Sequence, residues 1–584
     1  MVQGIQAPDL AYQAGSRWDR VIFPWSLIQK DGPDAWNEQY FSDAAIRAQA
    51  GRGVTMVGLM IYTPQWASVT PATGRPVDRP QGLNLAYNDP KNLWGQFVRR
   101  LAARQKGVVD NWIIWNEQDL YDMAIRYTWD GSYEEYLQLL KTAYLNIKEV
   151  NPQAKVIVGG FAYWWDKENN RPPYLGPLLE LIARDPDHQR NNEYFDAVTV
   201  HAYSAPLNSY AEPMIMRDIM AQRSIKKPIW IDESNAIPYD DPKNPLPYAQ
   251  LAATLDQQAA YVIQSMAMAL AAGVERYAIY KAIDEKPENG SDLYGLVRND
   301  NSLKPGYLAY QVGATYFANA TSAVYSWPGT SEVPNAQEIR SILASADNRP
   351  QFIWPAQVSQ VAMERGPNRT TVVWNNSPVD ITYQVPATAN RATLVTKFGK
   401  TSTIEAKNGS YSIDLPGSQN NPDRRDYSIY LIGGDPFIID EQVTPLPTDR
   451  VGSRIETVWP QGGADVKDAT RANVVAQLLM PGAASEPVPC RYKPETVQLW
   501  RRPNGGAPEL VGNGVRRIAE QPGIRYPVWD FGDVNVEYAR AEGRYYEFYV
   551  TVDGVQTDSQ VWTYGGPNAT DWRQPPLLPQ HSCA

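Results

Sequence analysis

Two glutamates stand at the ends of two strongly apolar segments of this chain. Glu117 ends the segment NWIIWNE at residues 111–117, and Glu233 lies near the end of PIWIDES at residues 228–234. A pair of carboxyl groups can cleave a glycosidic bond, because one donates a proton to the leaving oxygen while the other attacks the anomeric carbon or activates water. Double displacement with retention requires about 5–5.5 Å between the two groups. Either glutamate alone is more often a helix cap or a member of a surface ion pair, so the prediction rests on the pair.

The elements that must hold these glutamates follow a repeated pattern through the first 320 residues. Short apolar, β-branched runs alternate with longer helical patterns, which is typical of a parallel sheet with helices between its strands. The eight candidate strands are Val2–Gln6, Arg17–Phe23, Thr55–Ile61, Asn111–Trp115, Ala154–Gly159, Ala197–His201, Pro228–Asp232 and Arg276–Tyr280. Eight such units in about 320 residues predict a (β/α)8 TIM barrel, an α/β fold.

The barrel predicts where the two glutamates lie. Side chains at the C-terminal ends of barrel strands point into the active site, and the fourth and seventh strands lie across the mouth from each other. Glu117 and Glu233 are therefore expected to face one another. Asp232 is expected to point outward, because side chains alternate along a strand. The first strand is expected to be incomplete, since the chain begins within it.

After residue 320 the predicted secondary structure changes from alternating strands and helices to strands alone. Short alternating strands are predicted at Thr370–Trp374, Ile381–Val385, Thr393–Lys397, Tyr411–Leu415, Tyr427–Ile432, Val497–Trp500, Tyr545–Val552 and Val561–Tyr564. Gly, Pro and Asn turns separate them, as in β-sandwiches. We therefore predict a catalytic barrel over residues 1–320, a β-sandwich accessory domain over 321–442 and an immunoglobulin- or fibronectin-like β domain over 443–584.

Composition narrows the class of ligand. The net charge is −10 and no long basic run occurs, so nucleic acid and anionic membrane surfaces are not expected partners. The chain has 19 Trp and 35 Tyr but only 11 Phe. Trp and Tyr combine a flat apolar face with a polar edge, which suits the CH faces and hydroxyls of carbohydrate. The alternative is that β-rich domains use many aromatic residues for packing.

Other signals exclude further classes or leave them open. Three scattered histidines are too few for a typical zinc site, so neither a metal nor a cofactor is expected. Cys490 and Cys583 can pair or stay free, and spacing does not decide between these. The apolar stretch 261–274 is too short to span a bilayer. The start of the chain lacks the n-region and h-region of a signal peptide, although the appended β domains favour an extracellular or cell-surface location over a cytoplasmic one.

Several motifs together resemble glycoside hydrolase clan A, the retaining barrel glycosidases. Trp115-Asn116-Glu117 resembles the clan's acid/base motif, and WIDE at 230–233 resembles its nucleophile strand. HAY at 201–203 resembles the clan's His-x-Tyr segment, and TPQWA at 63–67 is similar to family 39 and its relatives. The resemblance covers about residues 1–320. One departure concerns the end of the eighth strand, where many members carry Trp and this chain has Tyr280.

The resemblance implies roles for further residues. Glu117 is implied to be the acid/base and Glu233 the nucleophile. The implied substrate-binding residues are Arg20, Trp25, Trp66, Asn116, His201, Tyr203 and Tyr280. Among them, Asn116 is implied to bind the 2-hydroxyl of the sugar and Tyr203 to contact the nucleophile. The alternatives are a structural ion pair for Arg20, a core histidine for His201 and plain packing for Trp25, Trp66 and Tyr280.

Residues and resemblance together predict a retaining hydrolase of O-glycosidic bonds in a β-linked oligo- or polysaccharide. Its cleavage would proceed by double displacement, with a secreted role in polysaccharide degradation as the expected setting. The alternative is a non-catalytic carbohydrate-binding protein on a barrel scaffold. The sugar, the linkage, endo or exo attack and the oligomeric state do not follow from the sequence.

Overall fold

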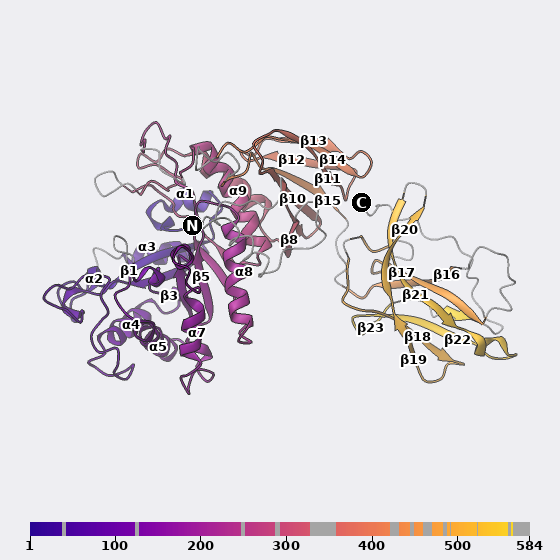
Figure 1. Ribbon diagram of the computed structural model, residues 1–584, viewed down its shortest axis with the longest axis horizontal. Helices are drawn as coiled ribbons and strands as arrows, with labels where there is room; N and C mark the ends of the chain where they lie inside the picture. The colour runs from indigo at the N-terminus through magenta and orange to yellow at the C-terminus, as the bar shows by residue number, and fades with distance from the viewer. Residues whose placement is uncertain are drawn as a thin grey trace.

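The structure is a computed structural model, and its parts differ in sheet type. It describes residues 1–37, 42–122, 128–246, 252–285, 292–326, 358–420, 431–443, 449–458, 470–482, 487–490, 492–521, 524–558 and 562–564. Within these residues, a parallel sheet occupies the N-terminal part and antiparallel sheets follow residue 320 (Figure 1). No helix of the described residues is long and apolar enough to cross a membrane.

The parallel sheet runs in chain order, each strand hydrogen-bonded to the next. Its strands are β1 (Trp18–Pro24), β2 (Thr55–Ile61), β3 (Val109–Ile114), β4 (Lys155–Phe161), β5 (Ala197–His201), β6 (Ile229–Glu233) and β7 (Arg276–Tyr277). Val2 closes the ring, because it bridges Arg20 of β1, donates its amide to Ile279 O at 3.0 Å and accepts from Ala282 N at 3.0 Å. The predicted (β/α)8 barrel is confirmed, with Val2 in the place of the first strand.

The first and last predicted barrel strands differ most from the structure, whereas the bounds of the others agree within two residues. Residues 4–6 of the expected first strand form the 3₁₀ helix η1 (Gly4–Gln6). The carboxylate of Asp19 accepts from Gly4 N at 2.8 Å and Ile5 N at 2.6 Å, which draws this backbone out of the ring. The last strand ends at Tyr277 rather than Tyr280, although Ala278 N still donates to Ile231 O of β6 at 2.8 Å.

Helices cover the outside of the barrel (Figure 1). They are α1 (Pro8–Gln13), α2 (Trp25–Ile28), α3 (Asp43–Gly51), α4 (Leu93–Gln105), α5 (Tyr133–Val150), α6 (Trp164–Glu168), α7 (Leu175–Ile182), α8 (Asn208–Ala221), α9 (Leu255–Ala271) and α10 (Pro305–Tyr316), with 3₁₀ turns η2 (Gln65–Ala67), η3 (Gln118–Leu120) and η4 (Asn192–Tyr194). Ser132 and Glu135 form a capping box at the start of α5, and Thr254 and Gln257 form one at the start of α9. These reciprocal hydrogen bonds satisfy amides that a helix start leaves unpaired.

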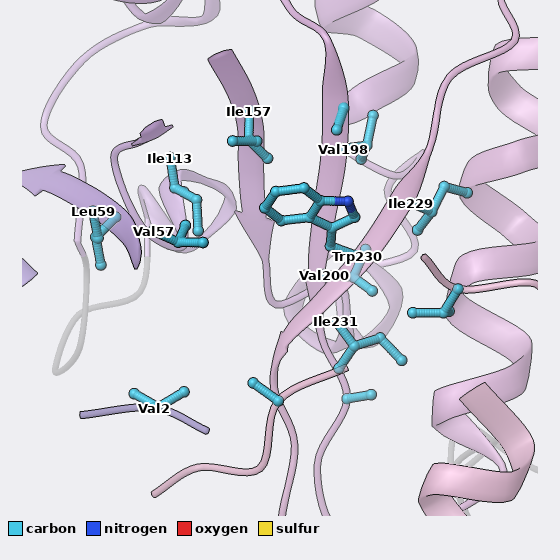
Figure 2. Packing of buried hydrophobic residues seen from close by; sticks show 14 of the residues in the cluster. Val2, Val57, Leu59, Ile113, Ile157, Val198, Val200, Ile229, Trp230 and Ile231 are labelled. Carbon is cyan, nitrogen blue, oxygen red and sulfur yellow. The ribbon is translucent and has the colours of Figure 1, made fainter. Parts of the chain in front are cut away.

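Alternation along β6 divides the core into an inner and an outer layer. Figure 2 shows the ring of Trp230 inside the circle of strands, with Val57, Leu59, Ile113 and Ile157 on the opposite side. Ile229, the preceding residue, points toward a helix. All of these side chains are buried, so the barrel is packed on both sides of its wall. Trp230 therefore marks the inward face of β6. Side chains an even number of residues from Trp230 along this strand face the inside of the barrel.

The second region forms two sheets that share a core. The strands are β8 (Ser322–Ser326), β9 (Val358–Arg365), β10 (Asn368–Asn375), β11 (Ile381–Pro386), β12 (Arg391–Thr396), β13 (Thr401–Glu405), β14 (Ser410–Leu415) and β15 (Phe437–Gln442). β11 and β14 pair with each other, and the other six form one sheet. Along β10, Val373 packs in the core between these sheets, whereas Val372 packs with the core of the barrel. The six-stranded sheet therefore joins the barrel on its outer face.

The last region has its own hydrophobic core. Its elements are β16 (Gly452–Val458), β17 (Arg471–Leu479), β18 (Val497–Pro503), β19 (Glu509–Asn513), β20 (Val515–Gln521), β21 (Ile524–Asn535), η8 (Glu537–Arg540), β22 (Tyr546–Val552), β23 (Val555–Gln556) and β24 (Trp562–Tyr564). They form two antiparallel sheets among the described residues. The described residues leave out most of the predicted strand Tyr427–Ile432 and residue 561 of the predicted Val561–Tyr564. They also leave out Cys583, so its pairing with Cys490 stays open as in the sequence analysis.

Candidate active site

The two glutamates converge where β3 and β6 end. Glu117 follows β3 by three residues, and Glu233 is the last residue of β6. A carboxylate oxygen of each lies within 4.8 Å of the other. His201 stands between them, with Nδ1 2.9 Å from Glu117 Oε1 and 3.5 Å from Glu233 Oε2. Two segments 116 residues apart in the chain thus present their acids to one small space.

The backbone around Glu117 is held in an unusual conformation. Trp115 has a φ of 70° and Glu117 a φ of 49°, both in the left-handed region. Non-glycine residues there cost of order 1–3 kcal/mol each and persist where surrounding contacts impose them. Glu117 N donates to Gly160 O at 2.9 Å, and the hydroxyl of Thr128 donates to the carbonyl of Glu117. These contacts hold the turn that aims the carboxyl group at the barrel mouth.

The expectation that Asp232 points outward is wrong. Its side chain is fully buried on the inner face of β6, as the alternation from Trp230 requires. The ladder between β5 and β6 shifts register here, since Val200 pairs with Ile231 and His201 with Glu233. The extra residue forms a bulge, which re-aims side chains at a strand end. Asp232 and Glu233 therefore both face the site.

Arg20 connects these two adjacent carboxylates. Its guanidinium lies 2.8 Å from Asp232 Oδ2 through Nη1 and 2.6 Å from Glu233 Oε1 through Nη2. Arg20 is fully buried on β1, so both ion pairs are shielded from solvent. The planar fork of arginine can hold two carboxylates in fixed positions. A structural ion pair is the alternative role that the sequence leaves open for Arg20. The pair with Asp232 fits this alternative, because Asp232 is fully buried.

His201 is surrounded by carboxylates. Its Nε2 lies 3.3 Å from Asp232 Oδ1, opposite the contact of Nδ1 with Glu117. Burial by itself lowers the pKa of His201, but the charges of Glu233 and Asp232 outweigh it and hold this pKa well above its ordinary value. Conversely, burial raises the pKa of Asp232, yet His201, Arg20 and Thr199 together hold it well below its ordinary range. The pair is therefore an imidazolium and a carboxylate.

Donor atoms of Glu117, His201 and Glu233 lie as close together as metal ligands would. Histidine binds metals through a neutral ring nitrogen. The raised pKa of His201, which follows from its carboxylate neighbours despite the opposing effect of burial, keeps the ring protonated. In this state the three side chains form an ion-pair network.

Three tyrosines line the other side of Glu233. The hydroxyl of Tyr203 donates to Glu233 Oε2. The rings of Tyr203, Tyr280 and Tyr294 lie edge to face in a triangle, with centroids 5.5–6.1 Å apart. Tyr280 donates to Asp292 Oδ2 at 2.6 Å, and Lys281 Nζ lies 3.0 Å from the same oxygen. Tyr280 thus joins the site where many clan members carry Trp.

Asn116 lies beside His201 at the back of the site. A methyl group placed on Gly160 would lie 3.2 Å from His201 Nε2 and 3.6 Å from Asn116 Oδ1, so the two side chains flank this glycine. Asn116 Oδ1 is buried and has no protein hydrogen-bond partner among the described residues. An acceptor without a partner beside two carboxyl groups is consistent with the implied contact to a sugar hydroxyl.

The two predicted tryptophan platforms have different outcomes. The prediction for Trp25 is wrong, because its ring is fully buried and stacks on Phe97 at 5.2 Å between centroids. Its indole N–H donates to Gln29 Oε1, which leaves no face or edge for a sugar. Trp66 is half-buried, lies edge to face with Trp25 and donates to Gln29 O at 2.6 Å. Trp66 as a platform stays a prediction.

Sequence reasoning missed some members of the site. Asp232 was available as the residue before Glu233, but strand alternation assigned it to the wrong face. Thr199, two residues before His201 on β5, donates to Asp232 Oδ1. The same period of two that places His201 inward places Thr199 inward. Asp292 lies in an irregular segment after the last strand, and no local pattern marks it.

Comparisons with known proteins agree with this geometry. No family model matches the chain. The chain is 25% identical over 248 residues to a beta-xylosidase of Caldicellulosiruptor saccharolyticus, an alignment that takes in 38% of this chain and 45% of the relative. The chain thus spans less than half the length of that curated relative.

Solved structures that resemble the chain include glycoside hydrolases. A family 39 glycoside hydrolase from the gut symbiont Bacteroides cellulosilyticus WH2 has a TM-score of 0.50 at 14% identity, over 74% of this chain and 77% of the other. A family 30 subfamily 8 xylanase from Clostridium acetobutylicum has a TM-score of 0.47 at 14% identity, over 75% and 93%. The predicted resemblance to clan A, and to family 39 within it, is confirmed.

Proposed function

We propose that this chain is a retaining glycoside hydrolase that cleaves β-linked sugars by double displacement. Glu233 acts as nucleophile and Glu117 as acid/base. The proposal is supported by the sequence similarity to a beta-xylosidase and by the barrel fold shared with a family 39 enzyme. Because the relative is named for xylosides, β-xylosides are the first substrates to test.

The separation of the two carboxyl groups carries the proposal. Their nearest oxygens lie within 4.8 Å. Retaining enzymes place the groups about 5–5.5 Å apart, whereas inverting enzymes need about 6.5–9.5 Å to admit a water between nucleophile and sugar. A separation at the short end leaves no room for that water, so direct attack by a carboxylate is the reaction that fits.

The first step follows from the partners of each acid. Arg20 and Tyr203 both donate to the carboxylate of Glu233, which orients it and partners its negative charge. This carboxylate attacks the anomeric carbon and forms a covalent glycosyl ester. Glu117 gives its proton to the leaving oxygen in the same step. His201 donates from Nδ1 to Glu117 Oε1, so the other oxygen of Glu117 is the one that carries the proton.

The second step reverses the roles. Glu117, now a carboxylate, removes a proton from a water molecule that attacks the anomeric carbon, and Glu233 leaves. Two cations, Arg20 and His201, and two anions, Asp232 and Glu233, balance in the resting site. We also propose a secreted setting and a polysaccharide-derived substrate, supported by the appended β domains.

A glycan panel tests the activity, with the anomeric configuration of the first product followed by NMR. Retention at the anomeric carbon supports double displacement, and inversion contradicts it. Azide then assigns the two roles. Glu117→Ala should form a glycosyl azide of retained configuration, because azide attacks the ester that Glu233 has formed. Glu233→Ala should form one of inverted configuration, because azide takes the place of the missing nucleophile.

A matched control separates these effects from loss of any glutamate. Glu134→Gln changes an exposed residue of α5 and should keep wild-type turnover. Hydrolysis of no glycoside by the wild-type protein, or full activity of either alanine variant, contradicts the proposed function.

A further inference from the structure

Two adjacent tryptophans of the barrel do not take part in its core. Within the described part of residues 1–320, the other nine tryptophans are buried in the core or packed against it. Trp164 and Trp165, the first two residues of α6, belong to neither group and are half-exposed. Keeping two large rings partly in water is unfavourable, so aromatic residues placed this way commonly mark a binding site.

Polar contacts fix the orientation of this pair. The indole N–H of Trp165 donates to Asp122 Oδ1 at 2.7 Å, and Arg171 Nη1 lies 2.6 Å from Asp122 Oδ2. The rings of Trp164 and Trp165 are tilted by 70° with centroids 5.5 Å apart, so they form two walls of a corner. Asp122 and Arg171 add charged hydrogen-bonding groups at its rim. The corner thus combines apolar faces with donors and acceptors.

The corner lies on the side of the site that belongs to Glu117. It follows β4, and the two residues before Trp164 bind the segment that follows Glu117. Ala162 N and Tyr163 N donate to the carboxylate of Asp119 at 3.2 and 2.7 Å. Near the end of β4 itself, Gly160 O accepts from Glu117 N at 2.9 Å. The loops after β3 and β4 are therefore joined immediately beside the proposed acid.

The side of the acid is the side of the leaving group, because the acid must reach the oxygen that departs. We propose that Trp164 and Trp165 bind the sugar ring of the leaving group by stacking. Asp122 and Arg171 form hydrogen bonds with the hydroxyl groups of this ring. The natural substrate is then an oligosaccharide rather than a glycoside of a small alcohol. This inference rests on the proposed function.

Substrates with and without a leaving-group sugar test the inference. β-Xylosyl fluoride has a leaving group that occupies no sugar site and needs no proton, whereas xylotetraose places further sugar rings there. β-Glucosyl fluoride and cellotetraose form a second pair. For Trp165→Ala and Trp164→Ala, kcat/KM on the tetrasaccharide should fall about tenfold, as expected for the loss of one stacking ring. kcat/KM on the fluoride should stay at the wild-type value.

Two further variants control for a loss of activity that comes from disturbed folding. Trp165→Phe keeps a ring but not the hydrogen bond to Asp122, and it should retain more activity on the tetrasaccharide than Trp165→Ala. Trp500→Ala removes a half-buried tryptophan of β18, in the last domain, and should leave both substrates unaffected.

Each contrary result has a distinct meaning. Equal losses on fluoride and tetrasaccharide in both alanine variants overturn the inference, since the tryptophans then support the site as a whole. Unchanged hydrolysis of the tetrasaccharide overturns it as well. A wild-type protein that hydrolyses no member of either pair refutes the proposed function itself and this inference with it.

Discussion

The hydroxyl of Tyr203 offers a selective test of the proposed mechanism. It donates to Glu233 Oε2 from a half-buried position, and the Tyr203→Phe variant removes this one contact while the ring stays. Burial, followed by the charge of Glu233, holds the pKa of Tyr203 well above its ordinary value, so the group remains a neutral donor. The substitution therefore removes a hydrogen bond to a charged group and leaves the packing almost unchanged.

The size of the effect differs between the two steps. Negative charge leaves Glu233 when the glycosyl ester forms and returns when the ester is hydrolysed, so the hydrogen bond strengthens only on the way to the second transition state. A hydrogen bond to a charged group contributes about 1.5–3 kcal/mol. At 1.36 kcal/mol per factor of ten, hydrolysis of the ester should slow by about 10- to 100-fold. Formation of the ester should slow less.

Pre-steady-state hydrolysis of an activated aryl glycoside measures this difference. Tyr203→Phe should release a burst of aryl alcohol followed by a slow steady rate, because the ester accumulates. The loss in kcat should exceed the loss in kcat/KM, which reports only steps through ester formation. Tyr174→Phe is the matched control. Its hydroxyl is buried without a hydrogen-bond partner among the described residues, so its removal should change neither constant. Losses of equal size in both constants without a burst would refute the reasoning.

Three further perturbations test other parts of the structure. Arg20→Met removes the cation between the two carboxylates of β6, and it should lower the free energy of unfolding by about 3–5 kcal/mol in chemical denaturation; a smaller loss than 1 kcal/mol would contradict the buried ion pairs. Gly160→Ala places a methyl group 3.2 Å from the imidazole of the site at a φ of +74°, so kcat/KM should fall, whereas Gly107→Ala has a φ of +79° and open space and should lose only stability. Burial, with the charge of a neighbouring aspartate, raises the pKa of Asp166 from its ordinary 3.8 to about 7. The folded protein then holds a proton that the unfolded chain loses between these values, so the free energy of unfolding should fall as pH rises through this window, and the fall should be smaller in Asp166→Asn; parallel curves would contradict the raised pKa.

The sequence by itself determined the features that depend on local pattern. Continuous apolar runs predicted the barrel strands, because such strands are buried on both faces. Alternating residues predicted the antiparallel strands after residue 320, because a strand buried on one face repeats every two residues. It also predicted that Glu117 and Glu233 meet, because the fourth and seventh strands of a closed barrel end at opposite sides of one mouth. The capping box at Ser132 is local in the same sense, since all its partners lie within one turn.

Only the tertiary structure decided which side chains share the site. A register shift between β5 and β6 brought Glu233 to the site beside the inward-facing Asp232, and a ladder between separate strands leaves no mark in the sequence of either one. The sequence pattern also left open which tryptophans are exposed. Trp25 is enclosed by helix α4, whereas Trp164 and Trp165, at the start of α6, lie outside the hydrophobic core. Exposure depends on what packs against a residue from elsewhere in the chain, and that is a property of the assembled fold.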